Sequence, residues 1–123
     1  MALSNTELQY RHRRTKKGTI SNKCASCMKN ARSKELAFEL TTEHLTYLWD
    51  MQEGRCALCG GPLGYIGTGW SAASVDRLSP IEGYVEGNVQ WTHWRCNDAK
   101  SNMENADFIN MCAAIAAAHF IPR

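Results

Sequence analysis

Sulfur and imidazole side chains occur in two closely spaced pairs in this sequence. Two residues separate Cys56 from Cys59, and two residues separate His93 from Cys96. A gap of this length lets both side chains of a pair reach one ion, and three thiolates with one imidazole suit the tetrahedral shell of Zn²⁺. Four protein ligands close that shell, which is typical of structural sites. We therefore predict a structural zinc site. The alternative is three small core cysteines and a hydrogen-bonded strand histidine.

Two further cysteines, Cys24 and Cys27, have the same spacing. They can share a second ion with His12 or Cys112, or they are packing and surface thiols, and the spacing alone leaves both explanations open. Cys112 is expected in the core.

The first residues show no apolar secretion signal, so we expect a cytoplasmic location, where reducing conditions disfavour disulfides.

A series of polar and glycine positions runs between the two predicted zinc pairs and just beyond them. In order it reads D-R, G-Y, G-N-V-Q and N-x-x-K, and its members are Asp76, Arg77, Gly83, Tyr84, Gly87, Asn88, Val89, Gln90, Asn97 and Lys100. In this series the chain resembles the HNH endonuclease family, in particular its phage-type members. The resemblance covers about residues 38–112 and includes the Q-x-G-R-C from Gln52 to Cys56.

The resemblance implies a two-stranded hairpin and a helix that grip one divalent ion, with Asp76 and Asn97 as its protein ligands. Oxygen donors and open water positions suit Mg²⁺ or Mn²⁺, which can stabilise the leaving 3′ oxygen of a phosphodiester. It also implies that Asn88 braces the loop of the hairpin, a role compatible with that of a turn asparagine after Gly87. The implied catalytic residues are Asp76, Arg77, Asn88 and Asn97.

One catalytic position departs from the family pattern. Familiar members have a histidine after the metal-binding aspartate, where it acts as general base, whereas here Arg77 follows Asp76 and stays protonated. Arg77 can instead hold the phosphate and neutralise charge in the transition state. The base is then open among several groups, namely His12, His44, Tyr84 and hydroxide on the metal. Tyr84 is also a candidate for direct nucleophilic attack.

The elements that must position these residues follow from hydrophobic periodicity. Alternation predicts two strands, over residues 73–78 and 88–93, that can pair as a hairpin. Helices are expected from Thr41–Thr42 to near Gly54, from Cys96 to about Met103, and from about Asn105 to His119. The last of these carries an apolar stripe for packing: Phe108, Ile109, Cys112, Ile115 and Ala116. The predicted fold class is α+β, a ββα-metal (HNH, or His-Me finger) core with structural zinc and flanking helices.

The charge is distributed unevenly along the chain. Residues 1–34 carry nine Lys and Arg against one acidic residue, a net charge of +8, whereas residues 35–123 carry five against eleven, a net of −6. We predict a basic N-terminal arm over 1–34 and a nuclease domain over 35–123. In the arm, residues 1–22 are expected to form a flexible or weakly helical tail with breaks at Gly18 and Ser21–Asn22, and a short helix is expected over 23–34.

A basic arm of this kind suits a polyanion and predicts salt-sensitive DNA binding. The predicted DNA-binding residues are Arg11, Arg13, Arg14, Lys16, Lys17 and Lys100. For Lys100, one turn after Asn97, a phosphate contact is the simplest role, and a solvated helix lysine is the alternative. Two tryptophans, Trp49 and Trp91, fit the core, whereas Trp70 and Trp94 can either stack on bases or support the zinc site.

These observations predict a metal-dependent endonuclease that nicks or cuts double-stranded DNA, with structural Zn²⁺ and catalytic Mg²⁺ or Mn²⁺. The resemblance to phage-type members suggests a phage-encoded protein in a bacterial cytoplasm, without membrane association and preferably monomeric. One alternative is a zinc-stabilised DNA-binding module whose nuclease centre has decayed, with Arg77 as the lesion. A second is a zinc module whose arm binds an acidic protein.

Overall fold

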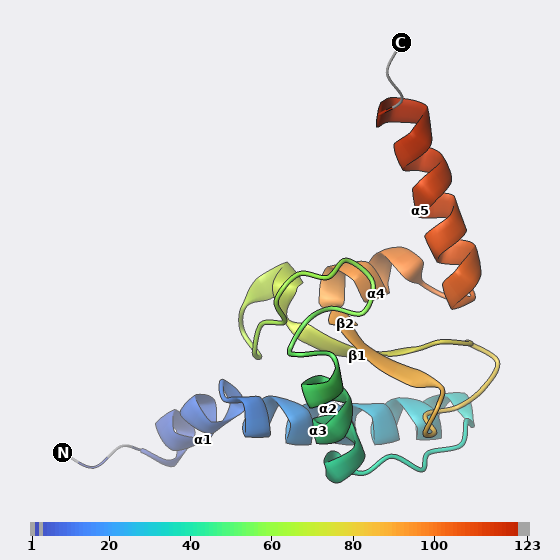
Figure 1. The fold of residues 1–123 in the computed structure, drawn as a ribbon. Coiled ribbons are helices and arrows are strands. Elements are labelled where there is room, and N and C mark those ends of the chain that lie inside the picture. The colour runs from blue at the N-terminus through green and yellow to red at the C-terminus, as the bar shows by residue number, and fades with distance from the viewer. Residues whose placement is uncertain (1, 3, 121–123) are drawn as a thin grey trace.

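The structure is a computed structural model that describes residues 2 and 4–120, without the side chains at positions 9, 10, 12 and 13. A small antiparallel hairpin lies between a long helix on one side and a short helix on the other (Figure 1). The elements in chain order are α1 (Asn5–Arg13), α2 (Lys16–Lys34), α3 (Thr42–Met51), the 3₁₀ turn η1 (Gly69–Ser71), β1 (Ala73–Arg77), β2 (Val89–His93), α4 (Trp94–Lys100) and α5 (Asn105–Phe120). The predicted α+β fold class is confirmed.

The hairpin of β1 and β2 forms where the alternating pattern predicts it. The strands pair antiparallel, with Val75 opposite Trp91 and Asp76 opposite Gln90. Val75 and Trp91 are buried, and the Asp76 carboxylate is buried on the opposite face of the same strand. Since successive strand residues point to opposite faces, the apolar positions anchor the hairpin in the core while Asp76 faces α4.

Helix α3 packs on the hairpin through two tryptophans. The rings of Trp49 and Trp91 meet edge to face with centroids 5.1 Å apart, and Trp91 Nε1 donates to the Leu45 carbonyl oxygen at 2.8 Å. Both tryptophans are core residues, as predicted. Gln52, just after α3, joins the helix end to β2, because its amide exchanges hydrogen bonds with the backbone N–H and C=O of Trp91.

Of the predicted flexible or weakly helical tail before residue 23, the structure has the helical form, and the predicted breaks at Gly18 and Ser21–Asn22 are wrong. Helix α2 starts at Lys16, where the Thr15 hydroxyl caps it by accepting a hydrogen bond from the Gly18 N–H at 3.0 Å. Gly18 is buried rather than a break, and Ile20, Cys27 and Ala31 join the hydrophobic core that includes α3 and the hairpin. The cap and this burial outweigh the low helix propensity of glycine. The division at residue 34 stays a prediction.

The expected packing of α5 is also wrong. Only Phe108 of the helix is buried, while Ile109, Cys112 and Ile115 are exposed. Figure 1 shows α5 pointing away from the rest of the molecule, so its apolar stripe beyond Phe108 has nothing to pack against among the described residues. The periodicity of that stripe identified a helix correctly but not its surroundings.

No described helix combines the length with the apolar character that crossing a membrane would require.

Candidate functional site: a metal-ligand cluster and an adjoining polar cleft

The four predicted zinc ligands converge at one end of the hairpin. The candidate ligand atoms of Cys56, Cys59, His93 and Cys96 all lie within 4.8 Å of one another. His93 Nδ1 lies 3.1 Å from the Cys59 sulfur, and the Pro62 carbonyl oxygen lies 2.8 Å from Nε2. That carbonyl accepts the Nε2 proton and leaves Nδ1 to face the sulfurs, the orientation found in histidine ligands of metals. The donor set therefore fits Zn²⁺.

The electrostatics of this cluster call for a cation. Burial, and after it the neighbouring Cys56, raise the pKa of the Cys96 thiol to about 12. For Cys56, burial also raises the pKa, but hydrogen bonds from the backbone N–H groups of Cys59, His93 and Leu58 outweigh it and lower the pKa overall. A bound Zn²⁺ would favour the thiolate form of all three cysteines.

The second cysteine pair lies elsewhere. Cys24 and Cys27 are on α2, and among the described residues neither belongs to a group of three or more metal-ligating side chains. Burial raises the pKa of Cys27 to about 12, so the thiol is neutral and packs in the core. Cys112 is exposed on α5 and does not join them, and the side chain of His12 lies outside the described residues.

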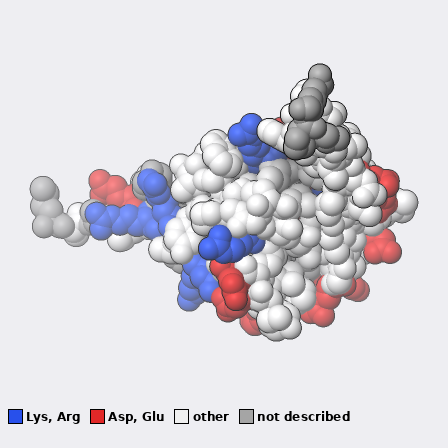
Figure 2. Space-filling view, turned by 45° about the horizontal axis from the view of Figure 1, so that its top comes forward, with Lys and Arg blue, Asp and Glu red and all other residues white. Residues whose placement is uncertain are grey.

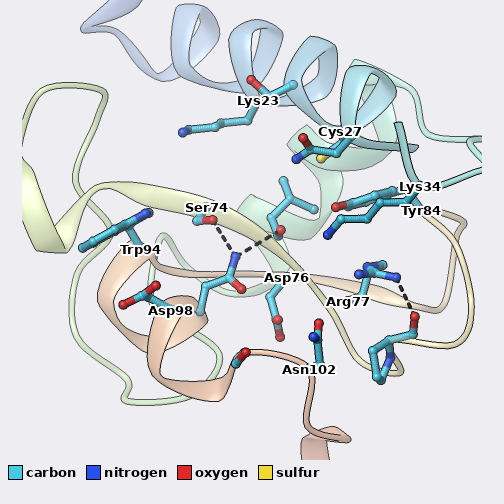
Figure 3. Close-up of a pocket in the computed structure, with 16 residues that line it drawn as sticks. Lys23, Cys27, Lys34, Ser74, Asp76, Arg77, Tyr84, Trp94, Asp98 and Asn102 are labelled. Atoms are coloured by element: carbon cyan, nitrogen blue, oxygen red, sulfur yellow. Dashed lines mark hydrogen bonds between the residues drawn. The ribbon is translucent and has the colours of Figure 1, made fainter. Parts of the chain in front are cut away.

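A polar cleft of about 400 Å³ lies between α2 and the unit formed by β1 and α4. Figure 3 shows Asp76 near its middle, Trp94 and Asp98 at one end, and Arg77 and Tyr84 at the other. The residues that line it are Lys23, Ser26, Cys27, Asn30, Lys34, Ser74, Val75, Asp76, Arg77, Pro80, Tyr84, Trp94, Asn97, Asp98, Ser101 and Asn102. The structure thus brings three of the predicted catalytic residues, Asp76, Arg77 and Asn97, into one cleft.

Asp76 is held by two donors on the same oxygen. Its Oδ2 accepts hydrogen bonds from Lys100 Nζ at 2.8 Å and from Gln90 Nε2 at 2.9 Å. Asp76 is only 4% exposed, and Lys100 is only 1% exposed. Lys100 Nζ also donates to the Arg77 carbonyl oxygen at 2.6 Å. Burial commits the Lys100 ammonium to Asp76 and to the strand backbone, so it is not exposed as the expected phosphate contact requires.

Asn97 turns its amide so that the nitrogen faces β1. Its Nδ2 donates to Ser74 Oγ at 2.7 Å and to the Val75 carbonyl oxygen at 3.4 Å. The amide oxygen is then the atom left for a metal, and amide and carboxylate oxygens are donors that Mg²⁺ and Mn²⁺ accept. Asp76 and Asn97 therefore supply the carboxylate and amide oxygens that a divalent ion of this kind prefers.

Arg77 is fixed at the rim of the cleft. Its Nη1 donates to the carbonyl oxygens of Pro80 at 2.6 Å and Glu82 at 3.2 Å, and its guanidinium carbon lies 5.3 Å from the centre of the Tyr84 ring. A guanidinium held in this way is a preorganised positive charge that needs little rearrangement when an anion arrives.

Asn88 braces the hairpin loop, as the resemblance implies. Its Nδ2 donates to the carbonyl oxygens of Ser79 and Gly83, and its Oδ1 accepts from the Ser79 N–H at 2.9 Å. Gly83 is required here, since a Cβ at that position would lie 2.3 Å from the Ala37 carbonyl oxygen. Asn88 thus acts on the cleft through the loop that holds Arg77.

The three side chains considered as general base have different positions. His44 does not line the cleft, and its Nδ1 lies 3.5 Å from a carboxylate oxygen of Glu86. Tyr84 does line it, but burial raises the pKa of its hydroxyl above the usual value, which keeps the phenol protonated near neutral pH. The side chain of His12 lies outside the described residues.

Sequence reasoning missed one wall of the cleft entirely. Lys23, Ser26, Asn30 and Lys34 come from α2, about fifty residues before Asp76. Their spacing of three and four residues on a helix could have been noticed. No feature of the sequence indicates that this face lies against β1. Asp98, beside Asn97, was missed for lack of a pattern that contains it.

The predicted DNA-binding arm lies beyond this wall. Arg11, Arg14 and Lys17 are exposed, whereas Lys16 pairs with Asp50 at 2.5 Å. The side chain of Arg13 lies outside the described residues. On the face drawn in Figure 2, most Lys and Arg side chains lie toward the end of the molecule that holds α1, and most Asp and Glu side chains lie at the opposite, lower edge.

A solved structure matches this architecture. The rare-cutting HNH restriction endonuclease PacI aligns with 80% of this chain and 78% of its own, with a TM-score of 0.60 and 21% sequence identity. The chain has an HNH fold. At that identity the match concerns the fold, and with the Cys₃His cluster it confirms the predicted ββα-metal core. No protein-family model matches the sequence of this HNH-fold chain, and no curated protein matches it either.

Proposed function

We propose that this protein is a metal-dependent DNA endonuclease. The observation that carries the proposal is the cleft, in which Asp76 and Asn97 present oxygen donors beside the fixed guanidinium of Arg77. The HNH fold supports it, since the matching structure is that of a restriction endonuclease. Structural Zn²⁺ bound by Cys56, Cys59, His93 and Cys96 is part of the same proposal.

The roles of the cleft residues follow from their contacts. Asp76 and Asn97 would hold Mg²⁺ or Mn²⁺, which when bound supplies Lewis-acid stabilisation of the charge that develops on the phosphate and the leaving oxygen. Lys100 and Gln90 fix the orientation of Asp76 through Oδ2. Arg77 places a positive charge at the rim, where it can bind a phosphate oxygen. Asn88 keeps that charge in place by bracing the loop.

Several finer points belong to the proposal as well. The substrate is double-stranded DNA, which is nicked or cut in both strands, and the exposed basic residues of the arm add affinity that falls as salt rises. A phage origin, a cytoplasmic location and a monomeric state are the accompanying predictions from sequence.

The test is incubation of supercoiled plasmid with the purified protein in Mg²⁺, Mn²⁺ or EDTA. We expect metal-dependent conversion to relaxed or linear product, and its loss in Asp76→Ala and Asn97→Ala. Asp107→Ala, an exposed carboxylate on α5, is the matched control and should cut like wild type. Binding without cleavage under every ion would support the decayed DNA-binding module instead. Binding of an acidic protein that duplex DNA does not displace would support the zinc module whose arm binds such a protein.

A further inference from the structure

Helix α2 presents one polar face to the cleft. Lys23, Ser26, Asn30 and Lys34 all line it, at intervals of three, four and four residues. Because side chains at these intervals lie on one side of a helix, the four form a single stripe along α2. The two lysines are eleven residues apart, which corresponds to about 16 Å along the helix axis.

This stripe belongs to a fixed wall rather than to a loose arm. Cys27, which lies on the same side of the helix, is buried in the core, and so is Ala31 one turn later. Asn30 on α2 and Tyr84 of the hairpin loop line the same cleft, and the Asn30 side chain is near enough to influence the pKa of the Tyr84 hydroxyl. The position of the stripe relative to Asp76 is therefore set by the core itself.

The two lysines stand at opposite ends of the cleft. In Figure 3, Lys23 lies above the end formed by Ser74 and Trp94, and Lys34 lies beside Tyr84 at the end near Arg77. Asp76 lies between these ends. Neither lysine makes an ion pair within the part of the chain that the structure describes, in contrast to Lys16 on the same helix, which is paired with Asp50.

An anionic chain running through the cleft would meet positive charge before and after Asp76. The phosphates of one DNA strand succeed one another at about 3.4 Å along the helix axis, so about 16 Å spans several of them. Ser26 and Asn30, between the lysines, are neutral hydrogen-bonding groups that suit phosphate oxygens without adding charge next to the metal ligands.

We propose that the α2 stripe is the binding site for the backbone of the strand that is cut, with Lys23 and Lys34 contacting phosphates on either side of the scissile one. The inference rests on the proposed function for the identity of the strand as substrate. It differs from the predicted DNA-binding residues of the arm, because Lys23 and Lys34 face the cleft whereas Arg11, Arg14 and Lys17 do not line it.

The test compares two double variants that remove the same charge from the same helix. Lys23→Gln with Lys34→Gln alters the stripe, and Lys29→Gln with Arg32→Gln alters exposed side chains of α2 that do not line the cleft. Affinity for a labelled duplex DNA oligonucleotide is measured without added Mg²⁺ or Mn²⁺ over a range of salt concentrations, so that cleavage plays no part and the zinc is not stripped by a chelator. Plasmid cleavage in Mg²⁺ or Mn²⁺ is measured separately.

For the stripe variant we expect the slope of log affinity against log salt to become shallower by about 1.8, since each phosphate contact contributes about 0.9. The control pair should change the slope by well under half of that. Lys23→Arg with Lys34→Arg should restore it. Thermal unfolding and zinc content are recorded for every variant, and they should match wild type because Lys29, Arg32 and Lys34 are exposed and Lys23 is only half-buried.

Equal slopes in the two double variants, or no DNA binding by the wild type, would overturn the inference. The proposed nuclease activity fails differently, in a wild type that binds DNA and never cuts it. A stripe variant that loses binding beside such a wild type would still support the α2 site.

Discussion

The zinc-ligand cluster and the polar cleft share one helix but are built on opposite principles. Cys96 and Asn97 are neighbours on α4, and one contributes to the cluster while the other contributes to the cleft. In the cluster, four side chains face one point and the ligand set is closed. In the cleft, only Asp76 and Asn97 offer the predicted metal donors, and the remaining walls are open to a large anion. The cluster therefore fixes α4, and the cleft beside it can remain open.

The largest effect is expected when one ligand of the closed cluster is removed. Cys56→Ser removes a buried ligand, and zinc binding in small metal-dependent domains carries about 10 kcal/mol or more of apparent free energy that is coupled to folding. We expect less than one zinc per chain by mass spectrometry, a much lower thermal midpoint, and loss of cleavage because α4 no longer holds Asn97. Cys112→Ser, at an exposed thiol on α5, should keep its zinc and its midpoint.

The second largest effect is expected at Lys100, the buried cation that holds Asp76 beside the cleft. Lys100→Met leaves the buried Asp76 carboxylate without its ion pair, and breaking such a buried pair costs about 3–5 kcal/mol. Denaturant unfolding should show that loss, and plasmid cleavage should fall because Asp76 loses a contact that orients it. Lys29→Met, at an exposed position of α2, is the control. Unchanged stability in Lys100→Met would mean that the pair contributes nothing.

A smaller effect is expected where the loop is braced. Asn88→Ala leaves backbone groups of Ser79 and Gly83 without their partner, at a cost of about 1–3 kcal/mol. Cleavage should drop while zinc content stays the same, because the loop serves the cleft and not the cluster. Asn110→Ala on α5 should show neither change. Zinc loss in Asn88→Ala would show that the two sites are coupled through the loop as well as through α4.

The smallest effect is expected at Tyr84. Burial raises the pKa of its hydroxyl, so the group keeps its proton at neutral pH and is a poor base or nucleophile there. Tyr84→Phe keeps the ring under Arg77. Its rate of plasmid cleavage should fall by far less than the factor of about 100 or more that removal of a general base costs. The pH profile of plasmid cleavage is the measurement. Loss of an alkaline limb in Tyr84→Phe would place Tyr84 back among the reacting groups.

The same contrast explains what could be predicted from sequence. Each half of the cluster is a pair of ligands close together in sequence, and the hairpin that joins the two pairs has a clear alternating pattern. The cluster and the hairpin were therefore predictable from the sequence between Cys56 and Cys96. Asp76, Asn88 and Asn97 were found through a resemblance. The α2 wall could not be found, because its contact with β1 depends on burial of Cys27 and Ala31 by residues far along the chain. Lys100 was misjudged because a helix pattern does not show that its ammonium is buried.

The isolated position of α5 has a consequence for how the molecule unfolds. Beyond Phe108 this helix is held by its own backbone hydrogen bonds, and a helix of 16 residues is close to the length at which helices are marginal in water. It should therefore open on its own, at a free energy far below that of the hairpin. Amide hydrogen exchange would resolve two cooperative units, a fast one in α5 and a slow one centred on Val75 and Trp91. The protein would then lose its last helix without losing its fold.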